Sequence, residues 1–199
     1  PKVKKVKKGS HVILHWRKGR GIEADGAIYY SKKIGKVNSG KVTTFSEYSI
    51  VSENRVTAIK LPKKIEKIAP CFGCSLSTAY GLVFKETKMR ASDKILIMGC
   101  GGLGMSIAAM ARTAGIKDIT FFDQNFNKFK SKFINSLKLS KKNKITSKLL
   151  LSKTSKQFNH VIDTTGNTKL IRLGFNLLDK DSNLILVGQP KINKSLTIF

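Results

Sequence analysis

Cysteine is scarce in this sequence of 199 residues. Only three cysteines occur, Cys71, Cys74 and Cys100. Three clustered cysteines are too few for the disulfide framework of a small secreted protein, and no secretory signal is visible at the start. We therefore expect a protein of the reducing cytoplasm.

Acidic residues are also scarce, with 12 Asp and Glu against 38 Lys and Arg, which gives a net charge of +26. Such a large positive charge suggests nucleic acid or an anionic membrane surface as a partner. The lysines are nevertheless spread along the whole chain, and the densest runs, 2–8 and 128–156, are not interleaved with aromatic residues. Dispersal favours a solvated, lysine-rich surface. A non-catalytic basic protein that binds nucleic acid is the alternative, and no specific nucleic acid is expected.

Long apolar runs suited to a membrane span are missing as well. Residues 95–111 carry no charge, but the stretch is short and contains four glycines. A strand, a turn and a helix explain it better than a membrane helix. Hydrophobic residues make up 41% of the chain, which is enough to bury a core.

The first third has an all-β pattern, with short apolar runs separated by glycine and charge. We predict strands in 11–16, 42–51 and 55–61, with a long loop over 17–41. A buried helix over 71–86 is expected to join two domains, which places the boundary at Pro70. Both ends of the sequence look like breaks in a longer protein, because it starts at Pro1 and is still apolar over 195–199.

From residue 94 onward, the pattern alternates between strands and helices. An amphipathic helix over 127–139 would place Phe129, Phe133 and Leu137 on one face, with Asn127 as its cap. Residues 138–156 are ambiguous, with a weak strand over 145–151. The expected strands are 94–99, 118–123, 160–164 and 183–188, and the other expected helices are 103–114 and 168–178. This alternation predicts an α/β fold with a doubly wound parallel sheet.

Residues 99–104, Gly-Cys-Gly-Gly-Leu-Gly, fit the dinucleotide-binding pattern G-x-G-x-x-G. The match gains weight because it follows an apolar strand and opens a helix. Gly99 permits the tight turn, Gly101 lets the backbone approach a pyrophosphate, and Gly104 lets the helix pack closely on the sheet. Gly102 and Leu103 complete the loop. The N–H groups at the helix start would hold the negative charge.

Asp123 ends the next predicted strand, where a carboxylate would accept hydrogen bonds from the hydroxyls of the adenine ribose. The same carboxylate would repel the additional phosphate of NADP, so NAD is the expected cofactor. Lys128 and Lys130 lie nearby in the sequence and would partly offset that repulsion. If the loop were only a packing turn, Asp123 would be an ordinary strand-end residue.

Together these residues resemble a known family, the zinc-containing alcohol dehydrogenases of the medium-chain dehydrogenase/reductase family. The resemblance rests on Lys8-Gly9-Ser10-His11-Val12, on Cys71 to Gly81 (CFGCSLSTAYG), on the glycine loop, Asp123 and Lys128, on the DTTGN run over 163–167, and on Val187-Gly188. These segments occur in the family's order and cover nearly the whole chain. The resemblance implies the end of a β-rich GroES-like catalytic domain over 1–70 and a C-terminally incomplete Rossmann domain over 71–199.

The resemblance also implies roles for single residues. Cys74 matches a ligand of the catalytic zinc, a thiolate suited to that ion. Read from the residues alone, the Cys71/Cys74 pair could instead be plain buried thiols, a redox pair or half of a structural zinc site, although no second C-x-x-C motif completes such a site. The remaining implied cofactor contacts are Thr78 and Leu103 at the nicotinamide, Lys128 at the adenine ribose, and Thr165, Val187 and Gly188 along the rest of the cofactor.

The sequence departs from the family in two places. The other ligands of the catalytic zinc and the proton-relay residues belong before Pro1, so the catalytic residues are unknown. The stretch between Trp16 and Val42 has no cysteine, so no structural zinc is expected. The implied activity is hydride transfer between an alcohol or aldehyde and NAD, in a homo-oligomer. The implied alternative is a zinc-independent NADPH reductase of the same family.

Overall fold

The computed structural model describes residues 2–139, 144–145, 157–193 and 195–196, the pair 144–145 as backbone only. Two compact units emerge, Pro1–Ser77 and Thr78–Phe199. The division falls inside helix α3 (Ser75–Tyr80), later along the chain than the boundary expected at Pro70. Among the described helices, none has the length and apolar character that a membrane span requires.

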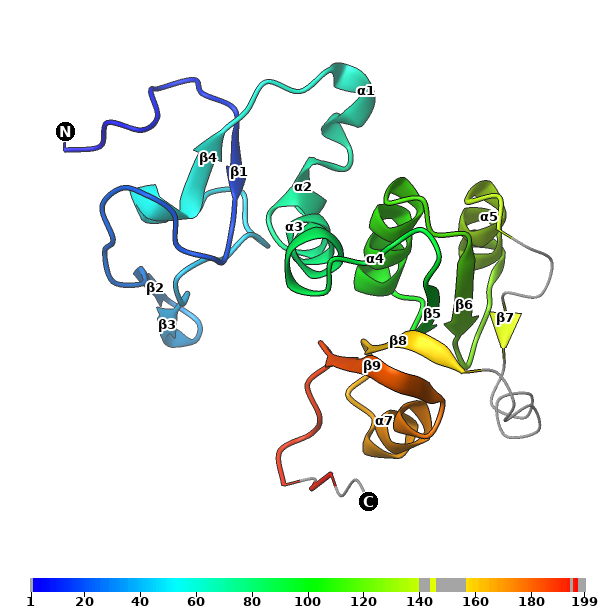
Figure 1. Ribbon diagram of the computed structural model, residues 1–199. Helices are drawn as coiled ribbons and strands as arrows, with labels where there is room; N and C mark the ends of the chain where they lie inside the picture. Colours follow the sequence, from blue (N-terminus) through cyan, green and yellow to red (C-terminus); the bar gives the residue numbers. More distant parts are fainter. Residues whose placement is uncertain (1, 140–143, 146–156, 194, 197–199) are drawn as a thin grey trace. The chain divides into compact units, whose positions relative to one another are not determined.

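The first unit is built from short elements (Figure 1). Strand β1 (Val12–Leu14) pairs antiparallel with β4 (Val56–Ala58), and the two lie within the strands predicted over 11–16 and 55–61. Strand β2 (Ile28–Ser31) pairs with β3 (Gly35–Asn38) in a separate hairpin. The remaining elements are the 3-10 turn η1 (Glu53–Arg55) and the one-turn helices α1 (Lys63–Glu66) and α2 (Ala69–Phe72).

Two predictions for this unit are wrong. The predicted loop over 17–41 contains the β2–β3 hairpin, whose turn is permitted by Gly35 in the left-handed region (φ +74°). The predicted strand over 42–51 does not form. There the hydroxyl groups of Thr43 and Ser49 bond to backbone carbonyls of Ser39 and Thr43, so local hydrogen bonds replace a sheet ladder.

One carboxylate ties together three segments of the first unit. Glu53 is buried and accepts hydrogen bonds from the backbone N–H groups of Lys4 (2.6 Å), Lys5 (2.7 Å) and Ile22 (2.9 Å). These bonds, of which that from Ile22 has the largest effect on the pKa, hold the pKa of Glu53 below its usual value. The charged side chain of Glu53 thus stabilises the packing of this unit and joins the N-terminal segment to the loop before β2.

The second unit contains the predicted parallel sheet. Its described strands are β5 (Lys94–Met98), β6 (Asp118–Phe122), β7 (Lys144–Ile145), β8 (Phe158–Asp163) and β9 (Leu178–Leu186). They lie in the order β7-β6-β5-β8-β9, and every described pairing is parallel. The helical elements are the second half of α3, the π-helical segment η2 (Gly81–Glu86), α4 (Gly102–Thr113), α5 (Lys128–Ser136) and α7 (Thr168–Phe175).

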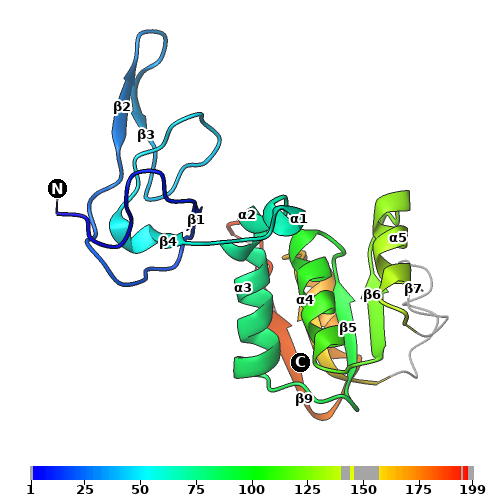
Figure 2. The ribbon, with the colours of Figure 1, turned by 90° about the horizontal axis from the view of Figure 1, so that it is seen from above.

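Helices cover both faces of this sheet (Figures 1 and 2). On β5, Ile95 and Ile97 pack with α4, η2 and Ile134 of α5, whereas Leu96 and Met98 point to the opposite face and pack with residues of α7. Both sets are fully buried. A strand that is buried on both faces reads as a continuous apolar run, which is why Lys94–Met98 was recognisable in the sequence.

Three expectations for the second unit and the helix that leads into it need correction. The helix over 71–86 is divided into α2, α3 and η2, and Cys71, Cys74 and Tyr80 are exposed instead of buried. Phe129 is 67% exposed, and Ile134 takes the central buried position of α5. Strand β9 begins earlier than expected, because Leu178 already pairs with the buried Phe158. Of the weak strand over 145–151, only Ile145 lies within the described residues, in β7.

Candidate cofactor site

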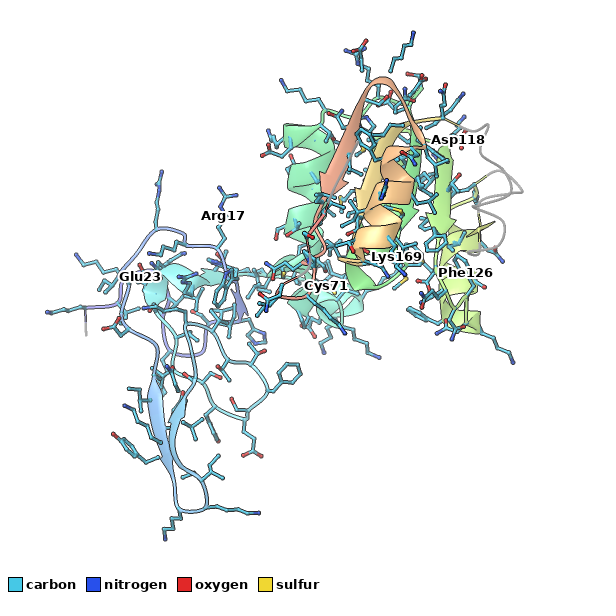
Figure 3. The ribbon with its side chains drawn as sticks, turned by 90° about the horizontal axis from the view of Figure 1, so that it is seen from below. Arg17, Glu23, Cys71, Asp118, Phe126 and Lys169 are labelled. Carbon is cyan, nitrogen blue, oxygen red and sulfur yellow. The ribbon has the colours of Figure 1, made fainter. Side chains whose placement is uncertain are left out.

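The candidate site lies at the carboxyl-terminal edge of the parallel sheet. The glycine loop follows β5, Asp123 follows β6, and the run 163–167 begins at the end of β8. In Figure 3, Phe126 and Lys169 mark this edge, and Asp118, the first residue of β6, lies at the opposite edge. Open α/β sheets bind ligands outside the carboxyl ends of their strands, where the strand order changes direction. Here the order changes at β5, between β6 and β8.

The first glycine of the loop is required by both conformation and space. Gly99 has φ +98°, which other residues rarely adopt, and a Cβ at Gly99 would lie 2.4 Å from Oγ1 of Thr164. The Thr164 hydroxyl donates to the carbonyls of Met98 (3.0 Å) and Gly99 (3.1 Å). The turn after β5 is therefore fixed directly against the turn after β8.

The other glycines fall into two kinds. A Cβ at Gly104 would lie 2.0 Å from the carbonyl oxygen of Gly99, so α4 packs on the turn at a distance that only glycine allows. At Gly101 and Gly102, by contrast, a Cβ would meet nothing within 4 Å. Because the first-turn N–H groups of a helix have no acceptor within the helix, the start of α4 presents donors to an open space. This arrangement suits a pyrophosphate.

Asp123 is connected to the glycine loop by a direct hydrogen bond. Its Oδ2 accepts from the backbone N–H of Cys100 at 2.7 Å and from Nζ of Lys130 at 2.8 Å. Its Oδ1 accepts from the N–H of Asn125 at 2.8 Å. Burial raises the pKa of Asp123, but the hydrogen bonds from Lys130, Asn125 and Cys100 outweigh it and lower the pKa below its usual value. The carboxylate is therefore charged at neutral pH.

A second, fully buried carboxylate organises the loop after β8. Asp163 accepts from the N–H of Thr165 (3.1 Å), the hydroxyl of Thr165 (2.6 Å) and the N–H of Gly166 (2.8 Å). Its carbonyl oxygen accepts from the N–H groups of Val187 and Gly188, both at 2.9 Å. A Cβ at Gly188 would lie 2.3 Å from the nitrogen of Gly166. The end of β9 is thereby held against the 163–167 run.

These turns enclose a pocket of about 280 Å³ beside the glycine loop. Its lining residues are Gly99, Phe122, Asp123, Gln124, Thr165, Asn167 and Leu170. Asp123 supplies the charge, Phe122 and Leu170 supply apolar surface, and Thr165 and Asn167 supply polar groups. Asp123 is the one carboxylate among these lining residues, so they do not offer a metal ion the several carboxylate ligands that it requires.

The structure brings together part of the predicted set. Gly99, Asp123 and Thr165 line one pocket, and Gly188 contacts the backbone of that loop. Leu103 and Val187 are half-buried against the core. Thr78 is exposed on α3, and Lys128 is exposed at the first position of α5, so neither is joined to the pocket by a described contact.

Sequence reasoning missed other residues of this site. Phe122, Gln124, Asn167 and Leu170 line the pocket, and Lys130 forms the ion pair that was considered only as a sequence neighbour of Asp123. Asn167 was detectable, because asparagine before a helix is a typical cap, and its Oδ1 accepts from the N–H groups of Lys169 and Leu170. The reach of Lys130 back to Asp123 has no sequence signature.

Cys74 belongs to the first unit and lines a different cavity, of about 410 Å³. The cavity is mainly apolar and also borders Trp16 and Gly73. Among the described residues, no group of three or more His, Cys, Asp or Glu side chains is placed to hold a metal ion. The described residues therefore do not fit a complete zinc site, since such a site requires three protein ligands.

Comparisons of the sequence with known proteins identify dehydrogenases as relatives. No family model matches the chain. The S-(hydroxymethyl)glutathione dehydrogenase of Saccharomyces cerevisiae is 28% identical over 163 residues, which are 77% of this chain and 42% of that protein. The enzyme of the same name from Komagataella pastoris is 26% identical over 190 residues, 90% of this chain and 49% of that protein. The resemblance to alcohol dehydrogenases is confirmed.

A solved structure supports the α/β fold of this chain. The benzyl alcohol dehydrogenase of Acinetobacter calcoaceticus superposes with a TM-score of 0.72 at 17% identity, over 100% of this chain and 60% of that one. At this identity the similarity establishes the fold alone. The chain spans a little under half the length of the two curated relatives.

Proposed function

We propose that this chain is the cofactor-binding part of an NAD-dependent alcohol dehydrogenase of the zinc type. The observation that carries the proposal is the junction of the glycine loop with Asp123, in which the N–H of Cys100 donates to Oδ2 of Asp123 at 2.7 Å. The junction puts donors for a pyrophosphate beside an acceptor for ribose hydroxyls, as a dinucleotide requires. When bound, NAD would accept a hydride from the carbon of an alcohol.

The residues of this chain would bind and orient the cofactor. The first turn of α4, open at Gly101 and Gly102, would hold the pyrophosphate, and Asp123 would accept from the ribose hydroxyls. Thr165 and Gly188, which are hydrogen-bonded to Asp163, would contact the remaining part of the cofactor. Thr78, Leu103, Val187 and Lys128 remain proposed contacts on the resemblance alone.

Cofactor titration tests this proposal. Calorimetry with the 199-residue chain should show binding of NADH in preference to NADPH, because in the proposed pose the carboxylate of Asp123 would repel a 2′-phosphate. Asp123→Ala should weaken NADH binding and reduce that preference. Equal affinities for the two cofactors, with no change in the Asp123→Ala variant, would contradict the proposal.

We propose Cys74 as one ligand of the catalytic zinc, with the other ligands and the proton relay supplied by residues other than those described. One thiolate cannot hold the ion against water. The chain by itself should therefore contain far less than one zinc per molecule and should not oxidise alcohols, although it binds NADH. Mass spectrometry of the metal content and the absorbance of NADH measure both. One zinc per molecule would show that the metal is placed wrongly.

A longer protein that includes the missing ligands offers the matched comparison. In it, Cys74→Ser should remove zinc and activity and leave NADH affinity nearly unchanged, because the glycine loop and Asp123 are not altered. Cys71→Ser, in the same C-x-x-C motif, is the control and should keep both. Full activity in the Cys74→Ser protein would exclude the assigned role. The substrate class would be a small alcohol or aldehyde.

A further inference from the structure

Lys130 lies at the candidate adenine-ribose end of the site and is held there by three hydrogen bonds. Its backbone N–H donates to Oδ1 of Asn127 at 2.9 Å, so the cap of α5 fixes its place in the first turn of the helix. Its Nζ donates to Oδ2 of Asp123 at 2.8 Å and to the carbonyl of Asn125 at 2.9 Å. The side chains of Lys130 and Asp123 are only 21% and 13% exposed.

This ion pair changes what Asp123 can do. The carboxylate is the group that would repel the 2′-phosphate of NADP, yet its charge is compensated by an ammonium group in direct contact. The two charges together are close to neutral toward a ligand in the pocket. A partly buried pair is also screened less by salt than an exposed one. The usual argument from a strand-end carboxylate to strong exclusion of NADP is therefore weakened here.

We propose that Lys130 is a specificity-determining residue that narrows the preference of this site for NAD over NADP. It does so by compensating Asp123 and by offering its ammonium group to a 2′-phosphate. The proposal rests on the proposed function, in that it takes the pocket beside Asp123 as the ribose end of a dinucleotide site. The ligand class that Lys130 admits is a 2′-phosphorylated adenine nucleotide.

The other lysines of α5 do not share this position. Lys128 and Lys132 are on the same helix, and both are exposed. Exposed lysines attract every anionic nucleotide through a field that salt screens over about 8 Å at physiological ionic strength. Only contact at the carboxylate discriminates one phosphate position from another. Lys132 is therefore the matched control for Lys130, with the same charge on the same helix.

The test uses two probes that differ only in the phosphate concerned, 5′-AMP and 2′,5′-ADP, with NAD and NADP as the complete cofactors. Calorimetry with the 199-residue chain at 0.15 M salt compares the wild type with Lys130→Met, Lys130→Arg and Lys132→Met. We expect Lys130→Met to lower the affinity for 2′,5′-ADP and NADP by about tenfold, and the affinity for 5′-AMP and NAD by less than about threefold. Lys130→Arg should behave nearly as wild type, because it keeps the cation.

The results distinguish an error in the role of Lys130 from an error in the proposed function. If Lys130→Met lowered the affinity for 5′-AMP and 2′,5′-ADP equally, the role of Lys130 would be overturned and the proposed function would stand. The same would follow if Lys132→Met lowered the affinity for 2′,5′-ADP as much as Lys130→Met. Failure of the wild type to bind either 5′-AMP or NAD would overturn the proposed function and this proposal together. Far-UV circular dichroism checks that Lys130→Met is folded. If it is not, a Lys130→Arg variant that lost 2′,5′-ADP binding with 5′-AMP binding intact would contradict the proposal.

Discussion

The two units of this chain are stabilised in different ways. The second unit is built on a parallel sheet whose central strand is buried on both faces, and the polar contacts of the candidate site lie at the carboxyl edge of that sheet. The first unit has two short antiparallel pairs and relies on Glu53, which binds three backbone N–H groups. Large apolar residues such as Tyr30 and Phe45 are exposed there. Apolar burial withstands acid, whereas a carboxylate hub depends on its charge.

One property of the sequence makes this comparison measurable. The chain has a single tryptophan, Trp16, which belongs to the first unit. The longer helices α4, α5 and α7 belong to the second. In urea unfolding of the whole chain, tryptophan fluorescence therefore reports the first unit and far-UV circular dichroism mainly reports the second. The variants below are ordered by the size of the expected effect.

Gly104→Ala should have the largest effect. The new Cβ would meet the carbonyl of Gly99 at 2.0 Å, so α4 must move away from the turn. We expect a loss of about 3 kcal/mol in the free energy of unfolding of the second unit, seen by circular dichroism. Gly101→Ala, with open space at its Cβ, should unfold as wild type and mainly weaken NADH binding. Equal stability of the two variants would contradict the close packing of α4.

Glu53→Gln should lower the stability of the first unit, because Gln replaces one of the two accepting oxygens by an NH2 group, which cannot accept a hydrogen bond from a backbone N–H. The folded-state pKa of Glu53 lies below the unfolded value of 4.5. Its contribution is therefore present above that pH and is lost as the pH falls through the folded-state pKa.

The fluorescence transition of the wild type should accordingly shift to lower urea between about pH 5 and pH 3. In Glu53→Gln the shift should be smaller over the same interval. Asp25→Asn, which alters an exposed carboxylate of the same unit, is the control. A pH dependence that is identical in the Glu53→Gln variant and the wild type would show that Glu53 is not the hub.

Asn127→Ala should have the smallest of these effects. The side chain of Asn127 caps α5 by accepting from the N–H of Lys130, and loss of such a cap costs about 1 kcal/mol. The circular dichroism transition should shift while the tryptophan transition stays in place. Asn127→Asp keeps an accepting oxygen and should restore stability. A shift of both transitions in Asn127→Ala would mean that the two units unfold together.

The same difference between the units explains what the sequence could predict. Strands β5, β6 and β8 and helices α4 and α7 were predictable, because buried strands and amphipathic helices leave periodic apolar patterns. The first unit was harder, because side-chain hydroxyls near Thr43 replaced a strand that its apolar residues predicted.

The candidate site also has a part that the sequence could predict and a part that it could not. The glycine loop and Asp123 were predictable, because each has a fixed place in a strand, turn and helix. The contact of Lys130 with Asp123 depends on where a flexible side chain folds back, and the lining residues Gln124 and Leu170 belong to a surface that exists only after two turns meet. No local pattern encodes either feature.

Hydrogen exchange with and without NAD tests the central claim most directly. If the cofactor binds at the carboxyl edge of the second unit, saturating NAD should slow exchange in peptides that cover 99–106 and 163–170, because a bound ligand makes local opening of the turns in these peptides less frequent. The hairpin over 28–38 of the first unit should exchange at the same rate in both states. Slowed exchange in the hairpin with none in the glycine loop, although NAD binds, would contradict this account.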